Sequence, residues 1–177
     1  MITLLLGGVR SGKSALAVEL GRRHEGPVVF VATCPVLEGD DDLVTRIERH
    51  RGTRPGWPTV EEPVELVAAV EKVDDDALVL VDCLTLWVSN LMFRGDDEPE
   101  VTGAAAAFAD ALLDRLGDAV VVSNEVGSGV HPEGDLGRRY RDLLGRVNQI
   151  VAAAADTTLL VVAGRAVRLE EPWELLG

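Results

Sequence analysis

Positive charge is scarce in this sequence, and lysine is the scarcest source of it. The 177 residues include 17 basic and 30 acidic side chains, which give a net charge of −13, and only Lys13 and Lys72 are lysines. Proteins that bind nucleic acids neutralise phosphates with clustered lysine and arginine, so this composition argues against nucleic acid as a partner. Small phosphorylated or neutral molecules are the ligands it favours.

Paired cysteines and long apolar runs are also missing. Cys34 and Cys83 lack the C-x-x-C or Cys/His spacing of a zinc site and do not form a disulfide framework, so we expect small buried side chains next to strand ends. No apolar run approaches the roughly 18 residues that span a membrane, and the chain does not start with a basic, cleavable leader. We therefore expect no membrane insertion and a cytoplasmic location.

Length and hydrophobic content predict one domain over residues 1–177, because the chain, at 47% hydrophobic, is too short for two domains of ordinary size. Short apolar runs without polar alternation are typical of strands buried on both faces. These runs are Ile2–Leu6, Val28–Ala32, Ala77–Val81, Ala119–Val122 and Thr158–Ala163, with weaker candidates at Trp57–Glu61 and Ala166–Glu170.

Helical patterns alternate with these strands. They cover Lys13–Arg23, Asp42–Arg51, Pro63–Val73, Leu84–Phe93, Ala104–Leu116 and Leu136–Ala155, whereas residues 94–100 have the composition of a solvated loop. Alternating strands and helices predict an α/β fold with a mainly parallel central sheet and helices on both faces.

The strongest chemical signal follows the first apolar run. Residues 7–14 read G-G-V-R-S-G-K-S, a complete G-x-x-x-x-G-K-[ST] phosphate loop between a strand and an amphipathic run. Its backbone N–H groups and the next helix would hold phosphates, Lys13 would reach the β- and γ-phosphates, and Ser14 would ligate Mg²⁺. A glycine-rich turn without a ligand is the alternative, and the strand–loop–helix context disfavours it. The expected nucleotide-binding residues here are Gly7, Gly8, Val9, Arg10, Ser11, Gly12, Lys13 and Ser14.

A second signal is the acid that ends the apolar run from Ala77. Asp82 resembles the carboxylate that holds Mg²⁺ or takes the acceptor's proton in phosphate-loop proteins. The alternative is a cap for the helix that begins near Leu84. Both roles are compatible with each other.

A basic island interrupts the acidic chain. Residues 46–54 contain four arginines and one glutamate, a local charge of +3 that suits an anionic ligand. If the helix persists, Arg46, His50 and Arg54 share one face, and the flanking guanidinium groups favour a neutral, nucleophilic imidazole. A solvated basic face with an incidental histidine is the alternative.

The other two histidines carry weaker signals. His24 follows the first helix with Arg22 and Arg23, where positive groups suit the negative end of the helix dipole, so a structural role is expected. His131 lies in a glycine-containing loop that follows a strand, which is a ligand-binding position or a plain connection.

Seven short motifs occur together and in order along the chain. They are the phosphate loop at 7–14, A-T at 32–33, R-I-E-R-H-R at 46–51, R-P at 54–55 followed by Trp57, D-C-L-T at 82–85, S-N-E-V-G-S-G at 123–129 and G-R-V-N-Q at 145–149. From Met1 to about Ala163 the chain resembles the bifunctional adenosylcobinamide kinase and adenosylcobinamide-phosphate guanylyltransferase family of cobalamin assembly.

The resemblance implies a three-layer, RecA-like P-loop NTPase fold and two reactions. Adenosylcobinamide would be phosphorylated with ATP or GTP, and GMP from GTP would then pass through a guanylated His50 to the phosphorylated substrate. Lys13 and Asp82 would share the catalytic work with His50, Ser14 and Asp82 would ligate Mg²⁺, and relatives assemble as homotrimers. Further nucleotide contacts would come from Ala32, Thr33, Cys34, Arg46, Arg51, Gly52, Thr53, Arg54 and Glu61.

Two other functions compete with this interpretation. A monofunctional P-loop small-molecule kinase would transfer phosphoryl groups without any covalent nucleotide. A regulatory GTPase or a RecA-like ATPase would act by changing shape. The switch-type GTPase is disfavoured because no N-K-x-D guanine motif occurs: Asn124 is followed by Glu125-Val126-Gly127.

Overall fold

One seven-stranded sheet organises the protein, whose computed structural model describes residues 1–34 and 55–176. The strand order is β3-β2-β4-β5-β1-β6-β7, and every neighbouring pair is parallel except β6 with β7. The mainly parallel sheet predicted from the apolar runs is therefore confirmed. The strands are β1 (Ile2–Leu6), β2 (Val28–Ala32), β3 (Thr59–Glu61), β4 (Leu78–Asp82), β5 (Ala119–Val122), β6 (Thr157–Val162) and β7 (Arg165–Leu169).

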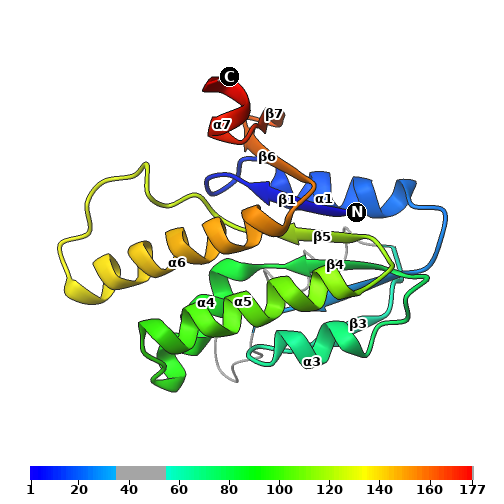
Figure 1. The fold of residues 1–177 in the computed structure, drawn as a ribbon, viewed down its shortest axis with the longest axis horizontal. Helices are drawn as coiled ribbons and strands as arrows, with labels where there is room; N and C mark the ends of the chain where they lie inside the picture. Colours follow the sequence, from blue (N-terminus) through cyan, green and yellow to red (C-terminus); the bar gives the residue numbers. More distant parts are fainter. Residues whose placement is uncertain (35–54, 177) are drawn as a thin grey trace.

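Helices cover both faces of this sheet, which makes three layers (Figure 1). On one face α1 contacts β1, β4 and β5, while α3, α4 and α6 pack with α5 on the other face. The described helices are α1 (Lys13–Arg23), α3 (Leu66–Glu71), α4 (Leu84–Arg94), α5 (Glu98–Asp114), α6 (Asp135–Ala154) and α7 (Pro172–Leu176). The helix expected over Asp42–Arg51 falls outside the described residues.

The central strands β1, β2, β4 and β5 are mostly apolar because both of their faces are covered, whereas the edge strands β3 and β7 carry charged and exposed side chains. Side chains alternate along each strand: Leu80 and Val122 join the cluster with Ala17 of α1, whereas Val81 and Val121 join the cluster with α4, α5 and α6. This alternation fixes the face to which each residue near a strand end belongs.

The expected loop over residues 94–100 is partly wrong, because α5 begins at Glu98 and not at Ala104. The Asp97 side chain accepts a hydrogen bond from the Glu100 N–H at 3.0 Å, and the Glu100 carboxylate accepts one from the Asp97 N–H at 2.7 Å. This capping box, with Pro99 in the first turn, satisfies the N–H groups that would otherwise be unpaired at the helix start.

The C-terminal strands form a hairpin that rises above the rest of the molecule and carries α7 (Figure 1). Ala163 and Gly164 connect β6 to β7 with φ values of 50° and 72°, the backbone that a two-residue type I′ turn requires. The short helix α7 has no counterpart in the sequence prediction. Within residues 1–34 and 55–176, no helix combines the length and apolar character needed to cross a membrane.

Candidate active site

The phosphate loop connects the end of β1 to the start of α1, as its motif predicts. The Ser11 N–H donates to the Gly8 carbonyl at 3.2 Å, and Lys13 Nζ donates to the same carbonyl at 3.0 Å, so the loop closes on itself. Gly12 adopts a left-handed backbone with φ 104°. A Cβ at Gly7 would lie 2.4 Å from the Val161 carbonyl oxygen. Every residue with a Cβ would clash there, so this position requires glycine.

The hairpin turn between β6 and β7 supports this loop from outside. The Gly164 N–H donates to the Ser11 carbonyl at 2.8 Å, and the Gly164 Cα lies 3.2 Å from where a Cβ on Gly12 would be. The phosphate loop is thus held by a segment about 150 residues later in the sequence. Such long-range support fixes a glycine-rich backbone that would otherwise be costly to order.

Lys13 and Asp82 both lie at the carboxyl edge of the sheet. Burial lowers the pKa of Lys13, and the electrostatic influence of Cys83 and then of Asp82 acts in the opposite direction, so the Asp82 carboxylate lies close enough to favour the charged lysine. Burial also raises the pKa of the intervening Cys83 to about 12, helped by Asp82, which keeps the thiol neutral at physiological pH. Cys83 occupies the N-cap position of α4, and its side chain makes no capping hydrogen bond.

Thr33 joins the end of β2 to the end of β4 beside Asp82. Its hydroxyl donates to the Cys83 carbonyl and accepts from the Cys83 N–H, both at 2.8 Å, and the side chain is fully buried. Ala32 and Asp82 are direct partners in the sheet. The segment 32–34, which we expect to contact the nucleotide, therefore lies at the same edge as Asp82. Cys34 and Cys83 both follow strand ends, as expected, but they are half-buried and not fully buried.

Glu61 lies farther from the phosphate loop than the other described site residues. It ends β3, the edge strand, and pairs with Ala32. Four strand intervals separate β3 from β1, about 19 Å at the usual spacing. Glu61 thus shares the carboxyl edge with the phosphate loop without meeting it.

Comparisons with known proteins identify the family. Residues 3–169 match the family described as cobinamide kinase / cobinamide phosphate guanyltransferase. The chain is 40% identical over 166 residues to the bifunctional adenosylcobalamin biosynthesis protein CobP of Pseudomonas aeruginosa, covering 93% of this chain and 94% of that protein. It is 38% identical to CobU of Salmonella typhimurium, described in the same words, over 96% of this chain and all of that protein.

The chain belongs to the cobinamide kinase / cobinamide phosphate guanyltransferase family. It is therefore a transferase of cobalamin biosynthesis with kinase and guanylyltransferase activity.

Solved structures with low sequence identity confirm the P-loop NTPase fold of this cobinamide kinase family member. A Pyrococcus horikoshii OT3 protein matches with a TM-score of 0.56 at 10% identity, covering 97% of this chain and 86% of its own. RadB recombinase matches with a TM-score of 0.50 at 18% identity, covering 90% and 73%. At these identities the likeness concerns the fold alone.

The oxygen atoms near Lys13 fit a magnesium ion brought by a nucleotide. Ser14 is half-buried, and its hydroxyl has no hydrogen-bond partner within the described part of the chain, while Asp82 supplies a carboxylate at the same edge. Mg²⁺ prefers such oxygen ligands and is usually held by one or two of them together with phosphates. No cluster of three or more His, Cys, Asp or Glu side chains that would hold a metal alone occurs among residues 1–34 and 55–176.

Part of the predicted site falls outside the described residues. This part is the basic island with His50, and it includes Arg46, Arg51, Gly52, Thr53 and Arg54. His24 and His131 are described. The His24 N–H donates to the Gly21 and Leu20 carbonyls at the end of α1, the structural position expected for it, and His131 contacts Arg141 at 2.7 Å on an exposed loop.

A buried polar network behind the site was not predicted. The Ser123 hydroxyl donates to Asn148 Oδ1 at 2.6 Å, and Asn148 Nδ2 donates to the Asn124 carbonyl at 3.0 Å. The Thr85 hydroxyl accepts from the Asn124 N–H at 2.9 Å, and its carbonyl accepts from the Tyr140 hydroxyl. The motifs D-C-L-T, S-N-E-V and G-R-V-N-Q contain all of these residues except Tyr140, but which of them contact each other depends on the fold.

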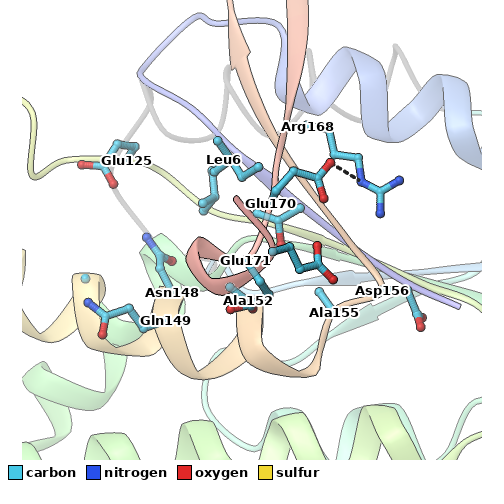
Figure 2. A pocket seen from close by; sticks show the side chains of 14 residues that line it. Leu6, Glu125, Asn148, Gln149, Ala152, Ala155, Asp156, Arg168, Glu170 and Glu171 are labelled. Atoms are coloured by element: carbon cyan, nitrogen blue, oxygen red, sulfur yellow. Dashed lines mark ion pairs between the residues drawn. The ribbon is translucent and has the colours of Figure 1, made fainter. Parts of the chain in front are cut away.

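A cavity of about 460 Å³ lies on the α6 side of the sheet, between α6 and the β6–β7 hairpin (Figure 2). Its wall includes Glu125, Asn148 and Gln149, and carboxylates of Glu170 and Glu171 on the hairpin side. None of the predicted site residues within 1–34 and 55–176 lines it. Its wall does include Leu6, the residue before the phosphate loop, and Glu125, whose N–H donates to the Gly7 carbonyl.

Proposed function

We propose that the enzyme first phosphorylates adenosylcobinamide with ATP or GTP. It then transfers GMP from GTP through a guanylyl-histidine at His50 to give adenosyl-GDP-cobinamide. The observation that carries the proposal is the phosphate loop, with Lys13 and Asp82 at the same edge of the sheet, in a chain of this family. The role of His50 rests on the R-I-E-R-H-R motif and its charge, because His50 lies outside the described residues.

In the kinase reaction, the hydroxyl oxygen of the aminopropanol arm attacks the γ-phosphorus. A new P–O bond forms while the bond to the β–γ bridging oxygen breaks, and a nucleoside diphosphate leaves. Lys13 and the loop N–H groups stabilise the charge that develops, and Asp82 is the candidate acceptor of the hydroxyl proton. Ser14 and Asp82 supply ligands for Mg²⁺, which when bound neutralises charge on the phosphates.

In the guanylyl transfer, a neutral His50 attacks the α-phosphorus of GTP, a P–N bond forms and pyrophosphate leaves. A phosphate oxygen of the phosphorylated substrate then attacks the same phosphorus and the P–N bond breaks. Two steps with a good nucleophile replace one crowded displacement. Arg46, Arg51 and Arg54, with Gly52 and Thr53 between them, would hold the phosphates, and the Glu61 carboxylate would accept N–H donors of the guanine edge.

Covalent labelling tests the histidine step. Incubation with Mg²⁺ and GTP labelled at the α-phosphate should give a protein adduct that survives denaturation, is labile to acid and is stable to base, as a P–N bond requires. His50→Ala should abolish the label and the guanylylated product but keep ATP-dependent phosphorylation of cobinamide. His131→Ala is the matched control, because His131 lies on an exposed loop, and it should label like the wild type.

Three results would contradict the mechanism. Equal labelling of His50→Ala would place the nucleophile elsewhere. Phosphorylation of cobinamide with no α-label on the wild type would instead support the monofunctional kinase, and nucleotide turnover that ignores cobinamide would support a switch protein.

We further propose a homotrimer in which the C-terminal hairpin takes part in subunit contacts. Large apolar side chains of the hairpin and of α7, which follows it, are exposed: Val167 is 63% exposed, Trp173 80% and Leu176 75%. Exposed apolar groups of this kind mark protein contacts. Light scattering should give three times the 18.9 kDa chain mass, and a monomer would refute the proposal. The cytoplasmic location stays a prediction.

A further inference from the structure

The β1–β5 ladder continues beyond the last residue of β5. Within the strands Leu5 pairs with Val122. Beyond them, the Ser123 N–H donates to the Leu5 carbonyl at 2.9 Å and the Glu125 N–H donates to the Gly7 carbonyl at 3.1 Å. The two bonds are two residues apart on both chains, which is the repeat of a parallel ladder. Residues 123–125 therefore keep the alternation of a strand.

This alternation assigns each of these residues to a face of the sheet. The Ser123 side chain bonds Asn148 of α6, and Glu125 lies in the cavity wall with Asn148 and Gln149 (Figure 2). Asn124, between them, belongs to the opposite face, where Val122 packs with Ala17 of α1.

Asp82 belongs to the same face as Asn124. On β4, Leu80 joins the α1 cluster and Val81 the other one, so Asp82 returns to the α1 side. Because β5 lies between β1 and β4, Asn124 is placed between the phosphate loop and Asp82. Each neighbouring strand is about 4.8 Å away, which is within reach of an asparagine side chain.

The backbone of Asn124 is fixed on both sides while its side chain is left available. Its N–H donates to the Thr85 hydroxyl of α4, and its carbonyl accepts from Asn148 of α6. The half-buried side-chain amide has no hydrogen-bond partner within residues 1–34 and 55–176. Fixed backbone and unused N–H donors together describe a group preorganised for a ligand.

We infer that Asn124 is a further catalytic residue of the kinase reaction, whose side-chain amide donates hydrogen bonds to the terminal phosphate of the bound nucleotide. The inference rests on the proposed kinase function. A neutral donor suits this place, because it stabilises charge that grows on phosphate oxygens during transfer without competing with Lys13 for Asp82. Removing one such donor typically costs about 10²- to 10³-fold in kcat.

The test compares Asn124→Ala, Asn124→Asp and the control Ser128→Ala in the full chain. Ser128 is exposed in the same loop, and only its backbone N–H bonds Glu125, so this control should keep the wild-type rate.

For Asn124→Ala we expect cobinamide phosphorylation to fall about 10²-fold or more in kcat. Affinity for ADP and the urea midpoint should stay unchanged. Binding of ADP with aluminium fluoride, which mimics the transferred phosphoryl group, should weaken. Asn124→Asp should lose more, because a carboxylate repels phosphate.

Asn148→Ala separates positioning from contact. It removes one buried and one partly buried hydrogen bond, so the urea midpoint should fall together with kcat. If Asn124→Ala keeps kcat within threefold of the wild type, the inference is overturned while the proposed function stands. If the wild type does not phosphorylate cobinamide at all, it is the proposed function that fails.

Discussion

Replacing Gly12 by alanine should test how the phosphate loop is held. Gly12 has φ 104° and ψ 0°, and Gly95, at the end of α4, has φ 106° and ψ 7°. A left-handed backbone costs an L-residue roughly 1–2 kcal/mol. The same substitution at the two sites therefore carries the same backbone penalty, and Gly95 is a matched control.

The surroundings of the two glycines differ. A Cβ at Gly95 meets nothing within 4 Å, whereas a Cβ at Gly12 would lie 3.2 Å from the Gly164 Cα. Relieving that contact displaces the hairpin turn and weakens the Gly164 N–H bond to the Ser11 carbonyl, worth about 1 kcal/mol. We expect the free energy of unfolding to fall by about 1–2 kcal/mol in Gly95→Ala and about 2–3 kcal/mol in Gly12→Ala.

Urea unfolding and titration with a fluorescent GTP analogue would measure the two effects. Nucleotide affinity should fall about tenfold or more in Gly12→Ala, which corresponds to 1.4 kcal/mol, and stay unchanged in Gly95→Ala. Equal losses of stability and equal affinities in both variants would refute the idea that the hairpin turn supports the phosphate loop.

Three further predictions follow from single side chains. Lys13→Ala should lower both transfer reactions at least tenfold, because the described chain has one phosphate loop; full guanylyl transfer would require a second triphosphate site. Asp82→Asn should lower turnover most at limiting Mg²⁺ with the fold intact, and unchanged turnover would deny it a role in metal binding. Hydrogen bonds from Arg94 lower the pKa of Asp96 in the folded protein. The pair therefore stabilises the folded state at pH values above about 4, the pKa of Asp96 in the unfolded chain, and this stabilisation is lost as the pH falls through the lower pKa of the folded state. Asp96→Asn should cost about 1 kcal/mol at pH 7 and progressively less as the pH falls below about 4, and a cost that does not change with pH would contradict the pairing.

The features that the sequence predicted well are local ones. The phosphate loop needs only consecutive residues, and Asp82 ends a run that is apolar on both faces because helices cover both faces. The start of α5 was missed for a local reason too: E-P-E has the composition of a loop, but Asp97 and Glu100 cap each other and begin a helix there.

The features that the sequence did not predict join distant residues. Asn148 and Asn124 are 24 positions apart, and Gly164 reaches back to Ser11 across the whole domain. Ser11, Asn124 and Asn148 stand in short motifs, whereas Gly164 does not. The partner of each side chain depends on strand order, which the alternation of strands and helices does not specify.

The register between β1 and the chain after β5 places the side chains of Asn124 and Glu125 on opposite faces of the sheet. The ladder from β1 sends Asn124 to the α1 face and Glu125 to the α6 face through two backbone hydrogen bonds, at Leu5 and Gly7. A slip by one residue would exchange them and set a carboxylate against the phosphates, because strand side chains alternate with a period of two. Ser123 prevents that slip, since its buried bond to Asn148 forms in one register only. The polar network behind the site therefore does more than satisfy buried groups: it decides which of two neighbouring side chains the nucleotide meets.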